Sequence, residues 1–119
     1  MTALRKINLG DTFAEQWRMA HPTLPQPGRE VPILTTRKWR VDLAFATKRS
    51  NSTRDFLVVE CEGGVWSKGR HTRPSGFVKD IEKYNEIAVR GWRLVRVTAD
   101  MIKSGEALIV VERALGMRQ

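Results

Sequence analysis

The sequence predicts an α/β domain in which helices flank a mixed β-sheet, with the elements in the order α-β-β-β-α-β-α. Apolar residues recur at helical spacing near the start of the chain, over 77–90 and after residue 99. Between these segments, apolar and β-branched residues alternate or form short runs that are typical of strands. Because a strand, a helix and a second strand follow one another over 56–98, we expect these two strands to be parallel.

The first helix is predicted by Phe13, Trp17 and Ala20, which share one helical face and follow a start near Asp11. Three prolines within 21–28 then exclude a helix and predict a loop.

Alternating residues next predict two strands, at about 31–36 and 39–47, joined by a turn near 36–38. The polar segment KRSNSTRD predicts a hairpin loop, after which the β-branched run FLVVECE predicts a strand over 56–62.

An apolar stripe of Phe77, Ile81, Tyr84 and Ala88 predicts a helix over 77–90, which Gly91 ends. A strand over 92–98 and a helical region over 99–115, broken near Gly105, complete the prediction.

Length and composition indicate one domain over residues 1–119, with 41% hydrophobic and 29% charged residues. No apolar run reaches the roughly 20 residues that cross a bilayer, and no secretory signal is visible at the amino terminus. The single cysteine, Cys61, excludes an intrachain disulfide and a cysteine-rich zinc site. We therefore expect a cytoplasmic protein without a membrane partner.

The charge of the chain favours a polyanionic partner. Lys and Arg number 21 against 13 Asp and Glu, which gives a formal net charge of +8. Such an excess of positive charge attracts nucleic acid. The alternative explanation is that the charge only keeps a small protein soluble. Charge therefore indicates a class of partner and says nothing about chemistry.

Three carboxylates lie where strands are predicted, and their negative charge needs a positive partner. Asp42 interrupts one strand, while Glu60 and Glu62 end another and share a face of it. Gathered acids repel one another and are costly to desolvate. Salt bridges to arginines such as Arg40 or Arg96 would compensate them, and so would a divalent cation such as Mg²⁺.

The segment Val41-Asp42, followed by Val59-Glu60-Cys61-Glu62, resembles the motif of the PD-(D/E)XK nuclease superfamily. The segments ECEGGVW, GRHTR, DIEKYNEIA and GWRLVR resemble small phage and prophage endonuclease-like proteins akin to the Vsr-like branch. This resemblance covers roughly residues 11–115 and implies a restriction-endonuclease-like core.

The resemblance implies that Asp42 and Glu60 hold Mg²⁺, for which Mn²⁺ can substitute, with the backbone carbonyl of Cys61 as a third ligand. Glu15 matches a position where many members carry another acid, although it could equally cap or solvate its helix. The implied activity is hydrolysis of phosphodiester bonds in DNA, including branched or junction DNA, and a two-strand cut would favour a homodimer.

The chain departs from the motif at Glu62, where the pattern has lysine. A glutamate can act as general base or metal ligand, but it supplies no positive charge. Lys83 is a candidate to take the place of this lysine, or else a solvated helix lysine beside Asp80. The alternative to an enzyme is a catalytically inactive basic DNA-binding module on a nuclease-like fold.

A basic cluster in the loop after Gly64 is expected to contact DNA through phosphate and stacking interactions. His71 in this loop is a candidate for proton transfer or is simply an exposed histidine. The cluster consists of Trp66, Lys68, Arg70, His71 and Arg73.

Three further residues are expected to be structural. Trp39 and Trp92 are predicted to pack in the core, and Cys61 to face away from the acids, so that its thiol is no nucleophile.

Overall fold

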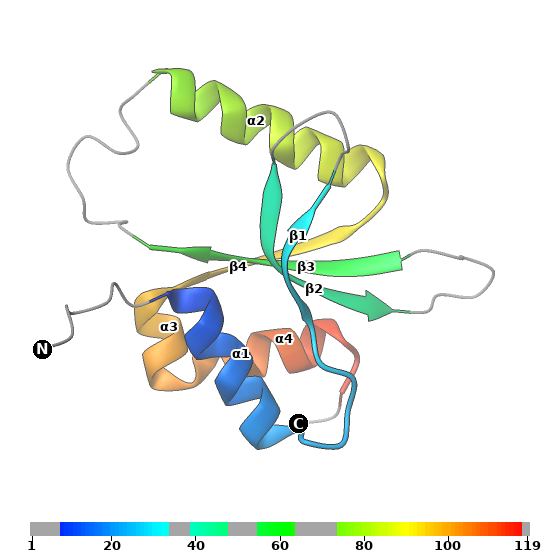
Figure 1. The fold of residues 1–119 in the computed structure, drawn as a ribbon, viewed down its shortest axis with the longest axis vertical. Coiled ribbons are helices and arrows are strands. Elements are labelled where there is room, and N and C mark those ends of the chain that lie inside the picture. The colour runs from blue at the N-terminus through cyan, green and yellow to red at the C-terminus, as the bar shows by residue number, and fades with distance from the viewer. Residues whose placement is uncertain (1–7, 34–38, 48–54, 64–73, 118–119) are drawn as a thin grey trace, which may run out of the picture.

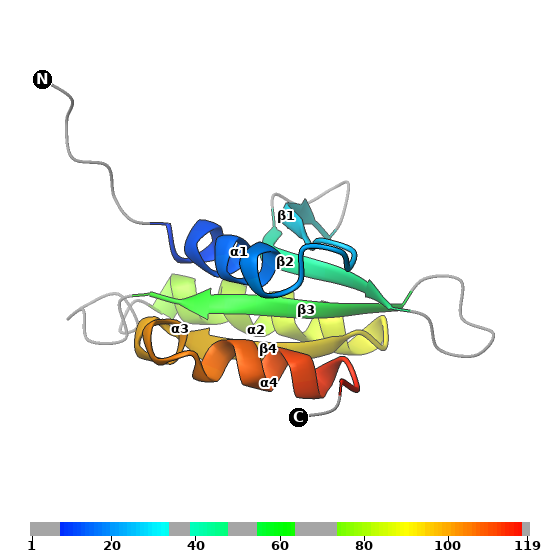
Figure 2. The ribbon, with the colours of Figure 1, turned by 90° about the horizontal axis from the view of Figure 1, so that it is seen from below.

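The computed structural model describes residues 8–33, 39–47, 55–63 and 74–117. The elements are α1 (Leu9–Ala20), β1 (Gly28–Pro32), β2 (Arg40–Thr47), β3 (Asp55–Glu62), α2 (Pro74–Val89), β4 (Arg93–Thr98), α3 (Ala99–Ser104) and α4 (Glu106–Ala114). In this part of the chain, α1, α3 and α4 cover one face of a four-stranded mixed sheet and α2 covers the other (Figure 1, Figure 2). The predicted order of elements is confirmed, and so is the break near Gly105, whose φ of 89° divides the last helical region.

The strands are ordered β1-β2-β3-β4 in the sheet. β1 pairs with β2 and β2 with β3 in antiparallel fashion, whereas β3 and β4 are parallel. The predicted parallel pair is therefore confirmed, since α2 carries the chain along one face of the sheet from the end of β3 back to the start of the neighbouring strand β4.

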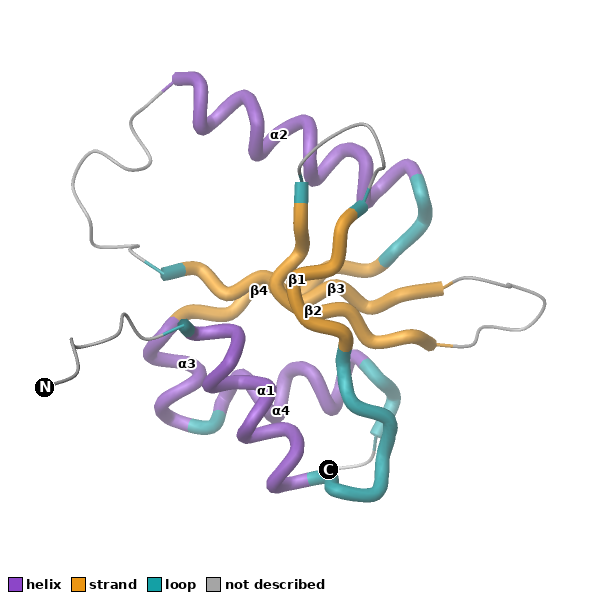
Figure 3. Tube along the Cα trace, viewed as in Figure 1, coloured by secondary structure: helices purple, strands orange, loops and turns teal. Residues whose placement is uncertain are grey.

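β2 separates from β3 partway along its length. The pairing between them runs from Thr47 and Asp55 to Leu43 and Val59 and then ends. The first residues of β2 pair with β1 instead, up to Pro32 opposite Arg40. Figure 3 shows β1 and the start of β2 turning toward α2 while β3 and β4 continue together. We call this divergence, between residues 40–42 of β2 and residues 60–62 of β3, the fork.

Several predicted boundaries were wrong. β1 spans Gly28–Pro32 and not 31–36, because its register is set by pairing with β2, and an edge strand tolerates a proline. α2 begins at Pro74 and not at residue 77, since proline fits the first turn of a helix. α1 begins at Leu9 because the side chain of Asn8 caps it by accepting from the Asp11 N–H at 3.1 Å.

The face of α2 that contacts the sheet also differs from the predicted stripe. Ile87 is buried and Tyr84 is half-buried, whereas Ile81 is 44% exposed. This rotation turns Lys83 toward the sheet as well, with only 16% of its side chain exposed. The orientation of α2 therefore determines which polar residues meet the fork.

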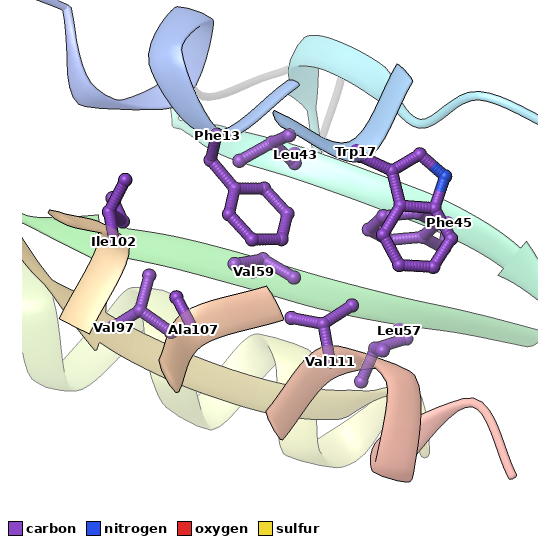
Figure 4. Close-up of a cluster of buried hydrophobic side chains, with 10 residues drawn as sticks. All are labelled: Phe13, Trp17, Leu43, Phe45, Leu57, Val59, Val97, Ile102, Ala107 and Val111. Atoms are coloured by element: carbon purple, nitrogen blue, oxygen red, sulfur yellow. The ribbon is translucent and has the colours of Figure 1, made fainter. Parts of the chain in front are cut away.

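The larger core lies between the sheet and the three helices on one face. Trp17 of α1 packs edge-on against Phe45 of β2, with ring centroids 4.9 Å apart. Figure 4 shows α1, α3 and α4 and the strands β2, β3 and β4 contributing side chains to this cluster. Its fully or nearly fully buried members are Phe13, Trp17, Leu43, Phe45, Leu57, Val59, Val97, Ile102, Ala107 and Val111.

A smaller core lies under α2 and includes Val58 and Ile87. Trp39 and Trp92 pack against it, as predicted. None of the helices in the described segments has the length and apolar character needed to cross a membrane.

Leu57→Ala is expected to lower the free energy of unfolding by ~3 kcal/mol, because Leu57 is fully buried and its loss leaves a cavity. Leu24→Ala, at a side chain that is 39% exposed, should change it by less than ~0.5 kcal/mol. Urea unfolding of both variants measures the difference. Equal losses would show that the sheet does not pack as described.

Candidate active site

The fork brings together three acidic residues and one lysine from three elements. Asp42 comes from β2, Glu60 and Glu62 from the carboxyl end of β3, and Lys83 from α2. Glu60 and Glu62 are two residues apart and both contact residues of α2, so the predicted shared face is confirmed.

The carboxylate of Asp42 is fixed by the backbone of β3. Its Oδ2 accepts a hydrogen bond from the Cys61 N–H at 2.8 Å. At this point the two strands no longer pair with each other, so the side chain takes the place of a backbone acceptor. Asp42 is thereby held next to Glu60.

Glu60 is 6% exposed and forms an ion pair with the ammonium of Lys83. Burial raises the pKa of the Glu60 carboxyl from 4.5 to about 7. Lys83 opposes this rise and the neighbouring Asp42 adds to it. One lysine therefore compensates the buried acid only in part.

The same ion pair decides between the two expectations for Lys83. The lysine is largely buried and contacts Glu60, so the interpretation as a solvated helix lysine beside Asp80 was wrong. The structure brings Lys83 to Glu60, one of the three acids of the fork.

Glu62 has a different set of partners. Its Oε1 accepts from Arg96 Nε at 2.7 Å and from the Tyr84 hydroxyl at 3.3 Å. The guanidinium carbon of Arg96 lies 4.9 Å from the centre of the Tyr84 ring. Burial and Glu62 raise the pKa of Tyr84, and the hydrogen bond to Glu62 raises that of Arg96. Both groups stay protonated as donors, so a salt bridge to an arginine is confirmed for Glu62.

Cys61 packs against the larger core, on the side of β3 away from the acids, as predicted. Burial, with Asp42 as the next cause, raises the pKa of its thiol to about 12. The thiol is therefore neutral and a poor nucleophile. Its backbone carbonyl accepts from the Gly63 N–H at 3.1 Å, which leaves one lone pair for a further donor or a cation.

Arg29 was missed from the sequence. Its guanidinium donates to the backbone carbonyl of Asp42, to Asn8 Oδ1 at 3.1 Å and to the Asp11 carboxylate. It lies against Gly10, where a Cβ would come within 2.7 Å of it. Arg29 thus joins the start of α1 to the bend in β2, and no local pattern reveals partners so far away along the chain.

Two other acidic or basic candidates lie elsewhere. Glu15 is exposed on α1 and pairs with Arg18 one turn later, so the structure does not bring it to Asp42 and Glu60. Arg40 donates to the carbonyl of Glu30 at 3.1 Å and not to an acid of the fork. The predicted DNA-contacting residues Trp66, Lys68, Arg70, His71 and Arg73 lie outside the described residues.

The described residues contain no group of three or more His, Cys, Asp or Glu side chains that could hold a metal ion. The oxygen ligands that the fork offers a cation are the carboxylates of Asp42 and Glu60, and the carbonyl expected as a third ligand belongs to Cys61, whose N–H binds Asp42. These are hard oxygen ligands of the kind Mg²⁺ prefers, with water in its remaining positions.

No protein-family model, curated protein or solved structure matches this chain.

Proposed function

We propose that this protein is a metal-dependent DNA endonuclease with a restriction-endonuclease-like core, in which Asp42 and Glu60 hold Mg²⁺ or Mn²⁺. The observation that supports this most is the contact of Lys83 with buried Glu60 beside Asp42. It supplies, from α2, the lysine that the PD-(D/E)XK pattern carries at the position of Glu62.

The electrostatics of Glu60 support a cation at this place. Its pKa stays near 7 although Lys83 is paired with it, because burial and Asp42 together outweigh the lysine. A divalent cation between the two carboxylates would favour both ionised forms. Desolvation of two neighbouring carboxylates costs free energy, and an inactive DNA-binding module would gain no function from them in return.

The chemistry is hydrolysis of a phosphodiester. A water oxygen forms the new bond to phosphorus, the bond to the leaving oxygen breaks, and the leaving oxygen takes up a proton. A bound Mg²⁺ would lower the pKa of that water and stabilise charge on the phosphate. Asp42 is oriented by the Cys61 N–H, and Glu60 orients Lys83. The Lys83 ammonium then stabilises negative charge that develops on the phosphate oxygens.

The substrate follows from charge and from the resemblance. A net charge of +8 favours a nucleic acid, and the resemblance to PD-(D/E)XK nucleases favours DNA, including branched or junction DNA. The basic cluster from Lys68 to Arg73 is proposed to add phosphate contacts, with His71 as a further proton donor or acceptor. A cut through both strands would favour a homodimer, because one such site handles one phosphate at a time.

Incubation with supercoiled plasmid, linear duplex, single strands and a four-way junction tests the proposal. Cleavage of at least one substrate is expected with Mg²⁺ or Mn²⁺ and none with EDTA. A folded sample that binds DNA but cuts no substrate would favour the inactive DNA-binding module. Cleavage that is unchanged by EDTA would contradict the metal-dependent mechanism.

A further inference from the structure

We infer that Arg96 is a phosphate-binding residue of this site and that Glu62 is a positioning residue that holds Arg96 in place. This inference rests on the proposed function, which it deepens by assigning a contact to the DNA backbone. It also gives Glu62 a role other than the general base or metal ligand expected from the sequence.

Arg96 is held on two sides. Its Nε donates to Glu62 Oε1 at 2.7 Å, and its guanidinium carbon lies over the ring of Tyr84, 4.9 Å from the ring centre. Tyr84 is itself tied to the same Glu62 oxygen by its hydroxyl, at 3.3 Å. A simple surface salt bridge has two partners and contributes little, whereas here a third residue also contacts the guanidinium.

The outer edge of the guanidinium is available to a ligand. Half of the Arg96 side chain, 51%, is exposed, and within the described segments Nε is the only one of its nitrogens that is hydrogen-bonded. Toward the part of the chain that the structure describes, the N–H groups on the two terminal nitrogens therefore remain as donors. The two terminal N–H groups of a guanidinium match two oxygens of one phosphate. A lysine ammonium cannot bind a phosphate in this way.

Arg96 lies next to the proposed metal ligands. It is the Cα partner of Glu60 in the parallel pairing of β3 with β4. Neighbouring strands are about 4.8 Å apart, so a DNA strand with a phosphate at Asp42 and Glu60 passes within reach of Arg96. β4 is an edge strand of the sheet, so among the described residues no further strand pairs beyond Arg96.

Glu62 is already committed to this arrangement. One of its oxygens accepts from both Arg96 and Tyr84, so the carboxylate is engaged in orienting a cation. The chain thus divides the task of the motif lysine, with Lys83 beside Glu60 and Arg96 beside Glu62. The departure of the sequence from the pattern at position 62 has this physical explanation.

The test measures binding of a short DNA duplex in EDTA by fluorescence anisotropy at several salt concentrations. Arg96→Gln is expected to weaken affinity by about tenfold and to reduce the slope of log affinity against log salt by about one. Arg18→Gln is the matched control, because Arg18 is 59% exposed in an ion pair with Glu15 on α1, and α1 lies on the face of the sheet opposite α2. It should change affinity by less than about twofold.

A second variant separates positioning from simple charge. Glu62→Ala removes a negative charge, so it would strengthen DNA binding and leave cleavage intact if Glu62 did nothing else. We expect it to lower the cleavage rate by about tenfold, and to have no further effect in the Arg96→Gln background, because the two act as a unit.

Two outcomes distinguish this inference from the proposed function. If the wild type cuts DNA and Arg96→Gln binds and cuts equally well, Arg96 is no phosphate ligand although the nuclease proposal stands. If the wild type cuts nothing but Arg96→Gln still weakens binding and reduces the salt slope, the phosphate contact stands and the nuclease proposal fails.

Discussion

Glu60→Gln is expected to reduce the rate of DNA cleavage by on the order of 10³-fold or more, because it removes a charged ligand of the proposed cation. The amide has nearly the same shape, and its oxygen can still accept from Lys83. Affinity for DNA in EDTA should stay the same or rise, since one negative charge near phosphate is lost. Plasmid nicking and anisotropy on the same samples measure both quantities.

Asp42→Asn should give a loss of the same order, on the order of 10³-fold, since the second charged ligand is removed. An asparagine oxygen can still accept from the Cys61 N–H, so the fork should keep its shape. Glu82→Gln and Asp100→Asn are matched controls at exposed positions of α2 and α3, and both should cut at the wild-type rate. If Asp42→Asn or Glu60→Gln cuts DNA at the wild-type rate, the substituted residue is not a ligand of the catalytic cation.

The second large effect concerns stability and needs no substrate. Between about pH 5 and pH 8.5, the metal-free protein is expected to lose ~3 kcal/mol of unfolding free energy relative to Glu60→Gln. The pKa of Glu60 is about 7 in the folded protein against 4.5 for the free group, so the folded state binds the proton more tightly. Ionisation of this carboxyl therefore costs stability as pH rises through the folded value, whereas the glutamine variant does not titrate.

Urea unfolding at both pH values in EDTA measures this difference. Addition of Mg²⁺ at the higher pH should stabilise the wild type more than Glu60→Gln, because a cation offsets the cost of the ionised form. Glu82→Gln again serves as the control, with a pH profile parallel to that of the wild type. If the profile of Glu60→Gln also runs parallel to that of the wild type, Glu60 does not carry an uncompensated charge.

The two experiments address separate properties of one site. A loss of cleavage in Glu60→Gln without the pH effect would indicate a ligand whose charge Lys83 already balances. The pH effect without any cleavage by the wild type would indicate that Glu60 is a buried acid with an incompletely compensated charge in a protein that does not cut DNA. The combination of both is what a metal site built on Asp42 and Glu60 requires.

Residue patterns alone predicted the strands that carry the acids. The run of apolar residues that ends in Glu60 and Glu62 predicts a buried strand. Alternation along this strand places both acids on one side and Cys61 on the other. The crossover through α2 predicted that β3 and β4 are parallel, and the structure adds the register that places Arg96 opposite Glu60. The shared face of the acids and the parallel direction follow from the period of a strand and from chain connectivity.

Only the tertiary structure decided which side chains compensate the acids. Lys83 contacts Glu60, and Arg96 and Tyr84 contact Glu62. Arg29, on the neighbouring strand β1, donates to the backbone carbonyl of Asp42 and joins it to the start of α1. Each contact depends on the rotation of α2 or on the point where β2 leaves β3, and these are set by packing of the whole sheet. Sequence periodicity specifies the face on which a residue lies, whereas the partner of a long charged side chain depends on how the elements pack together.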